Sequence, residues 1–178
     1  MSVQTPYELL ASIDQRCRAM SAELPSQEEN AESWSGIGFR IGQQHFVAPM
    51  SEVAEVLHEP RYTLLPGVKS WVKGVSNVRG RLLPVIDLAE FLGGQVPQEQ
   101  GERRVLVVDH DDVFAGIVVD AVLGMQHFEL DSFSEHLIDV EENLRNYAHG
   151  LFRRECKWLV FSPFALADSD DFMSVTLN

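Results

Sequence analysis

The sequence predicts a mainly β protein whose strands form two small barrel-like groups. Short runs rich in Val, Ile, Leu and Phe recur along residues 38–161, and turns containing Gly, Asp and Pro separate them. Many short strands at regular spacing are typical of barrels and sandwiches rather than of a doubly wound sheet. The polar loop 95–102 splits the strands into two groups of similar size, so we expect a subdomain division near 94–102. A chain of 178 residues suits two small subdomains that share a core.

The first 33 residues differ in character from the rest of the chain. Apolar side chains recur at spacings of three and four between Leu9 and Leu24, with Thr5 as the N-cap and Pro25 as the stop. This pattern predicts an added amphipathic N-terminal helix, followed by a polar, acidic linker. Such a helix packs on its own domain or docks on a partner, and the sequence leaves both open.

The first group of predicted strands begins where the spacing changes from helical to strand-like. Tight turns are expected at 42–44 and at Arg79-Gly80. A short helix over 87–92 follows, with Asp87 as its cap and two glycines after it. The expected strands are 38–41, 45–49, 53–58, 75–78 and 81–86.

The second group follows the polar loop and ends in another short helix over 163–167. The stretch 131–146 is acidic and polar, and we expect it to be irregular or partly helical. The main domain then covers 34–168, and 169–178 is expected to form an acidic C-terminal tail. The expected strands are 103–109, 113–119, 122–127, 147–153 and 157–161.

Charge and cysteine content exclude several classes of protein. The chain has 14 basic and 27 acidic side chains, and this net charge of −13 opposes binding to nucleic acid. Cys17 and Cys156 form no CxxC pair, so we expect reduced thiols in a cytoplasmic protein rather than a disulfide framework or a zinc knuckle. The first residues lack the features of a signal peptide, and we expect no direct membrane insertion.

Catalytic and metal-binding motifs are missing from the sequence. There is no P-loop, no GxSxG elbow and no pair of histidines at metal-ligand spacing. The acidic run 109–112 fits a solvated hairpin tip better than a cation site. We therefore expect no catalytic residues, no cofactor and no metal. A ligand-binding or enzymatic barrel assembled from distant residues stays open as the alternative.

The most informative segment is 71–88, which has the sequence WVKGVSNVRGRLLPVIDL. It predicts a strand, a tight turn and a second strand that leads into a capped helix. Gly74 permits backbone geometry that other residues resist, Asn77 can bind nearby backbone, and Pro84 suggests an edge or a bulge. Arg79 at the turn points outwards, which fits a solvated side chain as well as an interface anchor.

This segment resembles the signature of the CheW-like family of chemotaxis adaptors. That signature has a hydrophobic residue before Lys-Gly-Val, then Asn-hydrophobic-Arg-Gly, then Pro-Val-Ile-Asp-Leu. The resemblance extends over 34–167, in order and spacing. It includes Val53-Ala54-Glu55-Val56, Leu65-Pro66-Gly67, the strand 114–120 and the late strand 147–151.

The resemblance implies a fold of two five-stranded β-barrel subdomains around a shared core, with short helices. It also implies a non-catalytic scaffold that couples the cytoplasmic tip of a methyl-accepting chemoreceptor to the regulatory domain of a CheA-type histidine kinase. Such a protein is cytoplasmic and is recruited to membrane-bound receptor arrays. The partner-binding positions that the resemblance implies are Val53, Glu55, Gly74, Asn77, Arg79 and Met125.

Two features depart from the minimal family pattern. The N-terminal helix with its linker is extra, and Phe46-Val47-Ala48-Pro49 replaces a strand that usually contains tyrosine. Both resemble the PilI branch of the family, which serves the chemosensory system of type IV pili. This narrower resemblance implies a role in twitching motility.

Overall fold

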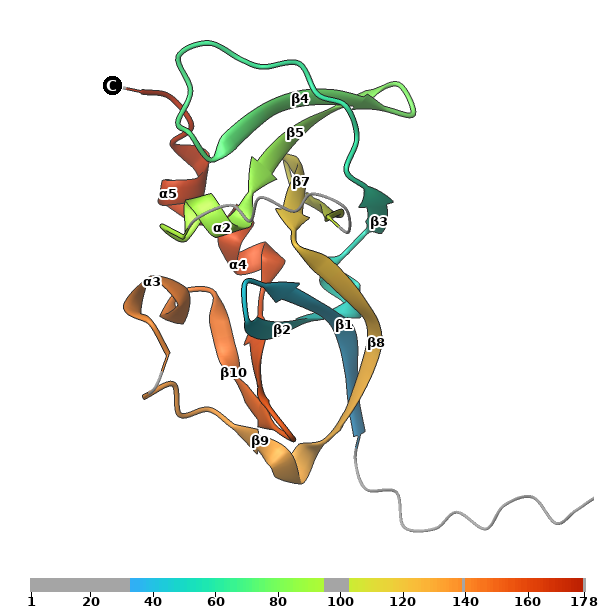
Figure 1. The fold of residues 1–178 in the computed structure, drawn as a ribbon, viewed down its shortest axis with the longest axis vertical. Coiled ribbons are helices and arrows are strands. Elements are labelled where there is room, and N and C mark those ends of the chain that lie inside the picture. Colours follow the sequence, from blue (N-terminus) through green and yellow to red (C-terminus); the bar gives the residue numbers. More distant parts are fainter. Residues whose placement is uncertain (1–32, 95–102, 139, 178) are drawn as a thin grey trace, which may run out of the picture. The chain divides into compact units, whose positions relative to one another are not determined.

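The computed structural model describes residues 33–94, 103–138 and 140–177, which fold into two β-sheets with short helices (Figure 1). The mainly β class is therefore confirmed. The predicted N-terminal helix lies outside the described residues. The strands are β1 (Ser33–Ile41), β2 (Gln44–Pro49), β3 (Glu55–His58), β4 (Val72–Val78), β5 (Arg81–Asp87), β6 (Arg104–His110), β7 (Val113–Val119), β8 (Ala121–Glu129), β9 (Phe133–Ser134), β10 (Ala148–Arg153) and β11 (Lys157–Phe161). The helices are η1 (Met50–Glu52), α2 (Leu88–Phe91), η2 (Leu130–Ser132), α3 (Glu142–Arg145), α4 (Pro163–Ala167) and α5 (Asp170–Met173).

Each sheet has an open hydrogen-bonding order among the described residues. The six-stranded sheet, here sheet A, runs β8-β1-β2-β11-β10-β9, and the five-stranded sheet, sheet B, runs β3-β6-β7-β5-β4. Neighbouring strands are antiparallel except for β11 with β2 and β5 with β7. The strand groups thus number six and five, and the ladders do not close into complete barrels.

The expected division near 94–102 does not separate the two sheets. β1 and β2 belong to sheet A, whereas β3, β4 and β5 belong to sheet B. After the polar loop the chain completes sheet B with β6 and β7, and then returns to sheet A with β8 to β11. The pairings that decide this, such as β3 with β6 and β2 with β11, join strands far apart in the sequence, so a polar loop could not reveal them.

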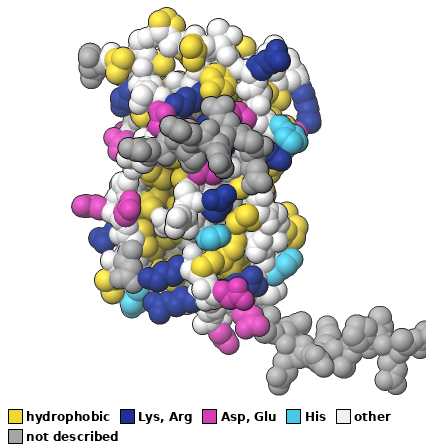
Figure 2. Space-filling model, viewed as in Figure 1, with side chains coloured by type: hydrophobic (Ala, Val, Ile, Leu, Met, Phe, Trp, Pro, Cys, Tyr) yellow, Lys and Arg dark blue, Asp and Glu magenta, His cyan; other side chains and the backbone are white. Residues whose placement is uncertain are grey.

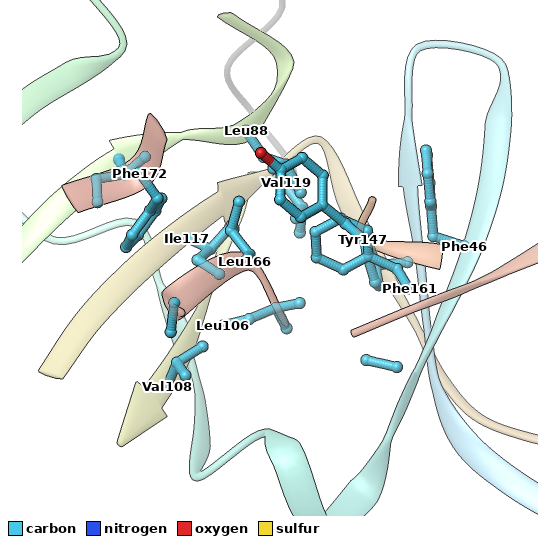
Figure 3. Close-up of a cluster of buried hydrophobic side chains, with 14 of the residues drawn as sticks. Phe46, Leu88, Leu106, Val108, Ile117, Val119, Tyr147, Phe161, Leu166 and Phe172 are labelled. Atoms are coloured by element: carbon cyan, nitrogen blue, oxygen red, sulfur yellow. The ribbon is translucent and has the colours of Figure 1, made fainter. Parts of the chain in front are cut away.

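Three apolar clusters explain how two curved sheets make one domain. One cluster lies within sheet A and contains Phe128, Phe152 and Trp158. Another lies within sheet B and contains Leu83, Val105 and Val118. The largest takes side chains from both sheets and is here called the shared core. Figure 3 shows part of the shared core, with Phe46, Leu88, Leu106, Val108, Ile117, Val119, Tyr147, Phe161, Leu166 and Phe172 labelled.

Alternation along the strands divides side chains between these clusters. On β2, Phe46 and Ala48 point to the shared core while Val47 points to the sheet A cluster. Glycine on β1 makes room for the large rings of that cluster. A Cβ on Gly36 would lie 2.5 Å from the Ala48 carbonyl oxygen on β2 and 2.7 Å from the Trp34 ring, so a side chain there would clash with backbone as well as with the indole.

The C-terminal residues are part of the fold, which corrects the prediction of an acidic tail over 169–178. Ser169 caps α5 by accepting a hydrogen bond from the Phe172 backbone N–H. Phe172 is 4% exposed and stacks on Trp71, with ring centroids 6.1 Å apart. Thr176 then pairs with Val68. The acidic side chains of the first turn of α5 face solvent. Because these residues make the segment acidic, its composition did not predict that Phe172 is buried.

Candidate functional site

The hairpin between β4 and β5 presents a residue with unusual backbone geometry. Its two-residue turn is Arg79-Gly80, with φ of 53° and 82°, as a type I′ turn requires. The Oδ1 of Asn77 accepts a hydrogen bond from the Gly80 backbone N–H at 2.9 Å. The side chain of Asn77 thus stabilises the turn, and the turn holds Arg79 at the tip.

Arg79 forms an ion pair that connects the two edge strands of sheet B. Its Nη2 lies 2.5 Å from Glu55 Oε1, and the two side chains are 76% and 32% exposed. Glu55 begins β3, and Arg79 follows β4, so the pair connects the two strands that end the order of sheet B. The guanidinium keeps most of its surface in solvent and can reach a partner without a change in the fold.

A second ion pair fixes the other side of the same turn. Arg81 Nη1 lies 2.8 Å from Asp109 Oδ2, and the Arg81 guanidinium lies 3.7 Å from the centre of the Phe114 ring. Glu55, Arg79, Arg81 and Asp109 are called the ion-paired tip below. It is polar, exposed and anchored on three strands.

Three exposed apolar residues lie outside the ion-paired tip. Met125 pairs with Ile37 across β8 and β1, and directly paired residues share one face of a sheet. Val56 pairs with Leu106, a shared-core residue, so Val56 also lies on the shared-core side of its sheet. Met125 is 52% exposed, Val56 is 38% exposed, and Met50 of η1 is 45% exposed. These three residues are called the apolar rim.

Two predicted site residues lie inside the fold. Val53 is 9% exposed and belongs to the shared core. Gly74 has a φ of 145°, and a Cβ there would lie 2.1 Å from the Thr63 carbonyl oxygen. Thr63 and Val75 exchange two backbone hydrogen bonds at this point. The geometry gives Val53 and Gly74 supporting positions, and their part in partner binding stays a prediction.

The structure brings Glu55, Asn77 and Arg79 together and leaves Met125 on the other sheet. The sequence interpretation missed Arg81, Asp109, Val56 and Met50. Alternation along β3 places Val56 on the face opposite to Glu55, which was a usable signal. Asp109 gave no such signal, because its contact with Arg81 depends on how sheet B is assembled.

The acidic turn after β6 is a hairpin tip, as the sequence predicted. Asp111 has a φ of 50° at the turn and is 84% exposed through its side chain. His110 stacks on Phe164 of α4, with ring centroids 3.9 Å apart. Its Nε2 lies 3.5 Å from Asp168 Oδ1. These contacts attach the hairpin to α4.

A family model for the CheW-like domain matches residues 35–171, which include the ion-paired tip and the apolar rim. The chain belongs to the CheW-like family. Its relatives include Protein PilI of Pseudomonas aeruginosa, which is 62% identical over 175 residues that cover 98% of each chain. They also include the chemotaxis protein CheW of Helicobacter pylori, 32% identical over 116 residues that cover 64% of this chain and 70% of the relative. The resemblance to the PilI branch is thus confirmed.

Solved structures agree with the fold. The crystal structure of the scaffolding protein TtCheW from Thermoanaerobacter tengcongensis matches 77% of this chain and 94% of its own, with a TM-score of 0.66 and 20% identity. Members of the CheW-like family are non-catalytic scaffolds, and this chain is a coupling adaptor of chemotaxis signalling rather than an enzyme. Within the described ranges, no helix is long and apolar enough to cross a membrane.

Proposed function

We propose that this CheW-like protein couples methyl-accepting chemoreceptors to a CheA-type histidine kinase in the chemosensory system of type IV pili. The proposal rests on one observation, namely that two adjacent residues of one strand belong to two different surfaces. Glu55 of β3 belongs to the ion-paired tip, and Val56 belongs to the apolar rim. A coupling adaptor needs two such surfaces, one for each partner.

The apolar rim suits the cytoplasmic tip of a receptor. Met50 and Met125 have unbranched, polarizable side chains that adapt to the surface of a helical partner. Val53 is buried in the shared core and fixes the segment between η1 and β3. A receptor helix packed here would continue the shared core outward.

The ion-paired tip suits the regulatory domain of the kinase. Arginine is enriched among the residues that dominate interface energies, because its planar fork donates several hydrogen bonds in fixed directions. Arg79 is 76% exposed and keeps donors free of Glu55. On the face shown in Figure 2, Lys and Arg side chains lie in several separate places, which fits local ion pairs with a protein better than a nucleic-acid track.

The link to twitching motility and to receptor arrays rests on the PilI relative. Its 62% identity extends over nearly the whole of both chains. We therefore propose that this adaptor acts at the cytoplasmic side of the receptor arrays that control type IV pili. Deletion of its gene should abolish twitching, and the wild-type gene should restore it.

Binding measurements with each partner alone test the assignment of the two surfaces. Arg79→Ala should weaken binding to the kinase regulatory domain by about 1–3 kcal/mol and leave receptor binding unchanged. Met125→Ser should weaken binding to the receptor signalling domain and leave kinase binding unchanged. Arg153→Ala and Met173→Ala serve as controls, because both residues are exposed and lie outside the two surfaces.

Circular dichroism must show intact folding of every variant. An Arg79→Ala protein that folds and binds both partners as the wild type does would contradict the role of the ion-paired tip. Equal loss of both partners in both variants would contradict the division into two surfaces.

A further inference from the structure

Three side chains that can ligate a metal meet at the β6–β7 hairpin, outside the ion-paired tip and the apolar rim. They are His110 at the end of β6, Asp111 in the turn and Asp168, the C-cap of α4. One ligand atom from each, a ring nitrogen or a carboxylate oxygen, lies within 4.8 Å of the other two. Spacing along the chain predicted no metal site, because only the packing of α4 beside the hairpin brings Asp168 to this place.

Contacts with α4 hold two of these side chains in position. The His110 ring stacks on Phe164 with an angle of 14° between the ring planes, which restricts how the imidazole can turn. The Asp168 backbone N–H donates to the Phe164 carbonyl oxygen at 2.9 Å, so the same residue of α4 positions both ligands. Asp111 follows His110 directly. The hairpin and the helix are thus already in contact, and binding of an ion requires little rearrangement.

The distances between the ligand atoms suit a metal ion better than they suit hydrogen bonds. His110 Nε2 lies 3.8 Å from Asp111 Oδ2 and 3.5 Å from Asp168 Oδ1. Both distances exceed the usual N···O distance of a hydrogen bond, about 2.7–3.2 Å. Ligand atoms arranged tetrahedrally around zinc, with bonds of about 2.0–2.2 Å, lie about 3.3–3.6 Å from one another. A small inward movement of Asp111 would therefore provide three ligand positions.

The local charge also favours a cation. Among the described residues, His110 is the only possible cationic group within ion-pair distance of the Asp111 or Asp168 carboxylate. While the imidazole is neutral, no contact balances these two negative charges, and the net charge of −13 adds to the attraction for cations. The His110 side chain is 24% exposed and both carboxylates are more than half exposed, so an ion can reach all three ligands.

The types of ligand distinguish between classes of metal ion. Ca²⁺ takes about six to eight oxygen ligands, and Mg²⁺ is bound through oxygen alone, so neither gains from an imidazole. Imidazole nitrogen together with carboxylate oxygen suits Zn²⁺ and similar transition metals. We propose that His110, Asp111 and Asp168 bind a divalent transition-metal ion of the zinc class, with water completing the coordination. The ion joins the β6–β7 hairpin to α4, and no residue of either partner surface takes part.

Isothermal titration calorimetry of the metal-free full chain with Zn²⁺ tests the proposal. We expect one saturable site per chain, which an excess of Mg²⁺ does not displace. Co²⁺ is the second probe, because nitrogen and oxygen ligands give it only weak visible absorption, whereas a thiolate of Cys17 or Cys156 adds strong near-ultraviolet absorption. Displacement by Mg²⁺, binding that shows only the thiolate signal, or absence of saturation at submillimolar Zn²⁺ overturns the proposal.

Variants with matched controls locate the site. His110→Gln and Asp168→Asn should each weaken Zn²⁺ binding by at least about tenfold, because each removes one of three ligands. Asp112→Asn removes the same charge from the same turn without removing a ligand, and His149→Gln changes an exposed histidine of β10, so both should bind as the wild type does.

Circular dichroism of each variant confirms that a loss of binding does not come from unfolding. Equal weakening by Asp112→Asn and Asp168→Asn would mean general charge attraction and would overturn the site. Unchanged binding in both His110→Gln and Asp168→Asn would overturn it as well, whereas failure of the adaptor function would appear only as lost kinase or receptor binding.

Discussion

Replacing Gly74 by alanine separates a packing role from a partner-binding role. The added Cβ would lie 2.1 Å from the Thr63 carbonyl oxygen, which is backbone and has no flexible end to move aside. Relief of this contact requires separation of Thr63 from Val75, whose two backbone hydrogen bonds measure 2.8 and 2.9 Å. Loss of two such bonds costs about 1–3 kcal/mol, and a backbone conformation reserved for glycine costs about 1–3 kcal/mol more.

We therefore expect Gly74→Ala to lower the free energy of unfolding by about 2–6 kcal/mol, a large part of the usual 5–15 kcal/mol. Urea unfolding of the purified protein measures this change. Gly80→Ala is the matched control, because its φ is also positive, at 82°, while no atom lies within 4 Å of the added Cβ. That variant should lose only about 1–2 kcal/mol. The packing argument would be refuted by a Gly74→Ala protein of wild-type stability that fails to bind the kinase, because Gly74 would then contact the partner directly.

Three further substitutions test the account of the fold. Phe172→Ala should lower the free energy of unfolding by about 3–5 kcal/mol, since the ring is 4% exposed between aromatic neighbours. Met173→Ala on the exposed side of α5 should lower it little. Equal thermal stability of the two variants would mean that the C-terminal residues are not part of the fold. Arg103→Met should lower the free energy of unfolding by about 3–5 kcal/mol, because it leaves buried Asp87 without its ion-pair partner. Arg153→Met, at an exposed position, is the control and should lower it little. Arg79→Ala should change the free energy of unfolding by less than about 1 kcal/mol, since its ion pair is largely exposed, and a larger loss by urea unfolding would mean that the pair closes sheet B.

Local features of the fold were predictable because they depend on neighbouring residues. Arg79-Gly80 signalled a two-residue hairpin, and Asp87 signalled a helix cap that accepts a hydrogen bond from the Glu90 backbone N–H. Pro84 shows the limit of prediction from neighbouring residues alone. An edge or a bulge was expected there, yet β5 lies between β4 and β7. The pairing with β7 begins only at Val85, so the missing N–H of the proline is tolerated inside the sheet.

Assembly of the site was less predictable, because it depends on contacts between distant segments. The sequence pointed to Glu55 and to Arg79 separately, through family resemblance, but nothing in the spacing of 24 residues showed that they form an ion pair. The apolar rim required knowledge of which strands become edges, since Val56 and Met125 are exposed only because β3 and β8 end their sheets. Val53 is an example of a buried residue that the sequence did not reveal. It lies two residues before Glu55, and this position does not predict that it is buried in the shared core.

The adjacency of Glu55 and Val56 gives the proposed adaptor a physical route between its partners. β3 has four residues and, among the described strands, pairs with β6; Leu57 anchors it on the sheet B cluster, and the ion pair to Arg79 joins Glu55 to the hairpin tip. A receptor that packs against Val56 and shifts β3 must also change the distance between Glu55 and Arg79, which alters the surface offered to the kinase. Linkage then requires the converse, that the kinase changes receptor affinity by the same factor. Because the exposed ion pair contributes little to the free energy of unfolding, it can break and re-form at small cost. Arg79 is therefore free to change its contacts when a partner binds, although it matters little for folding.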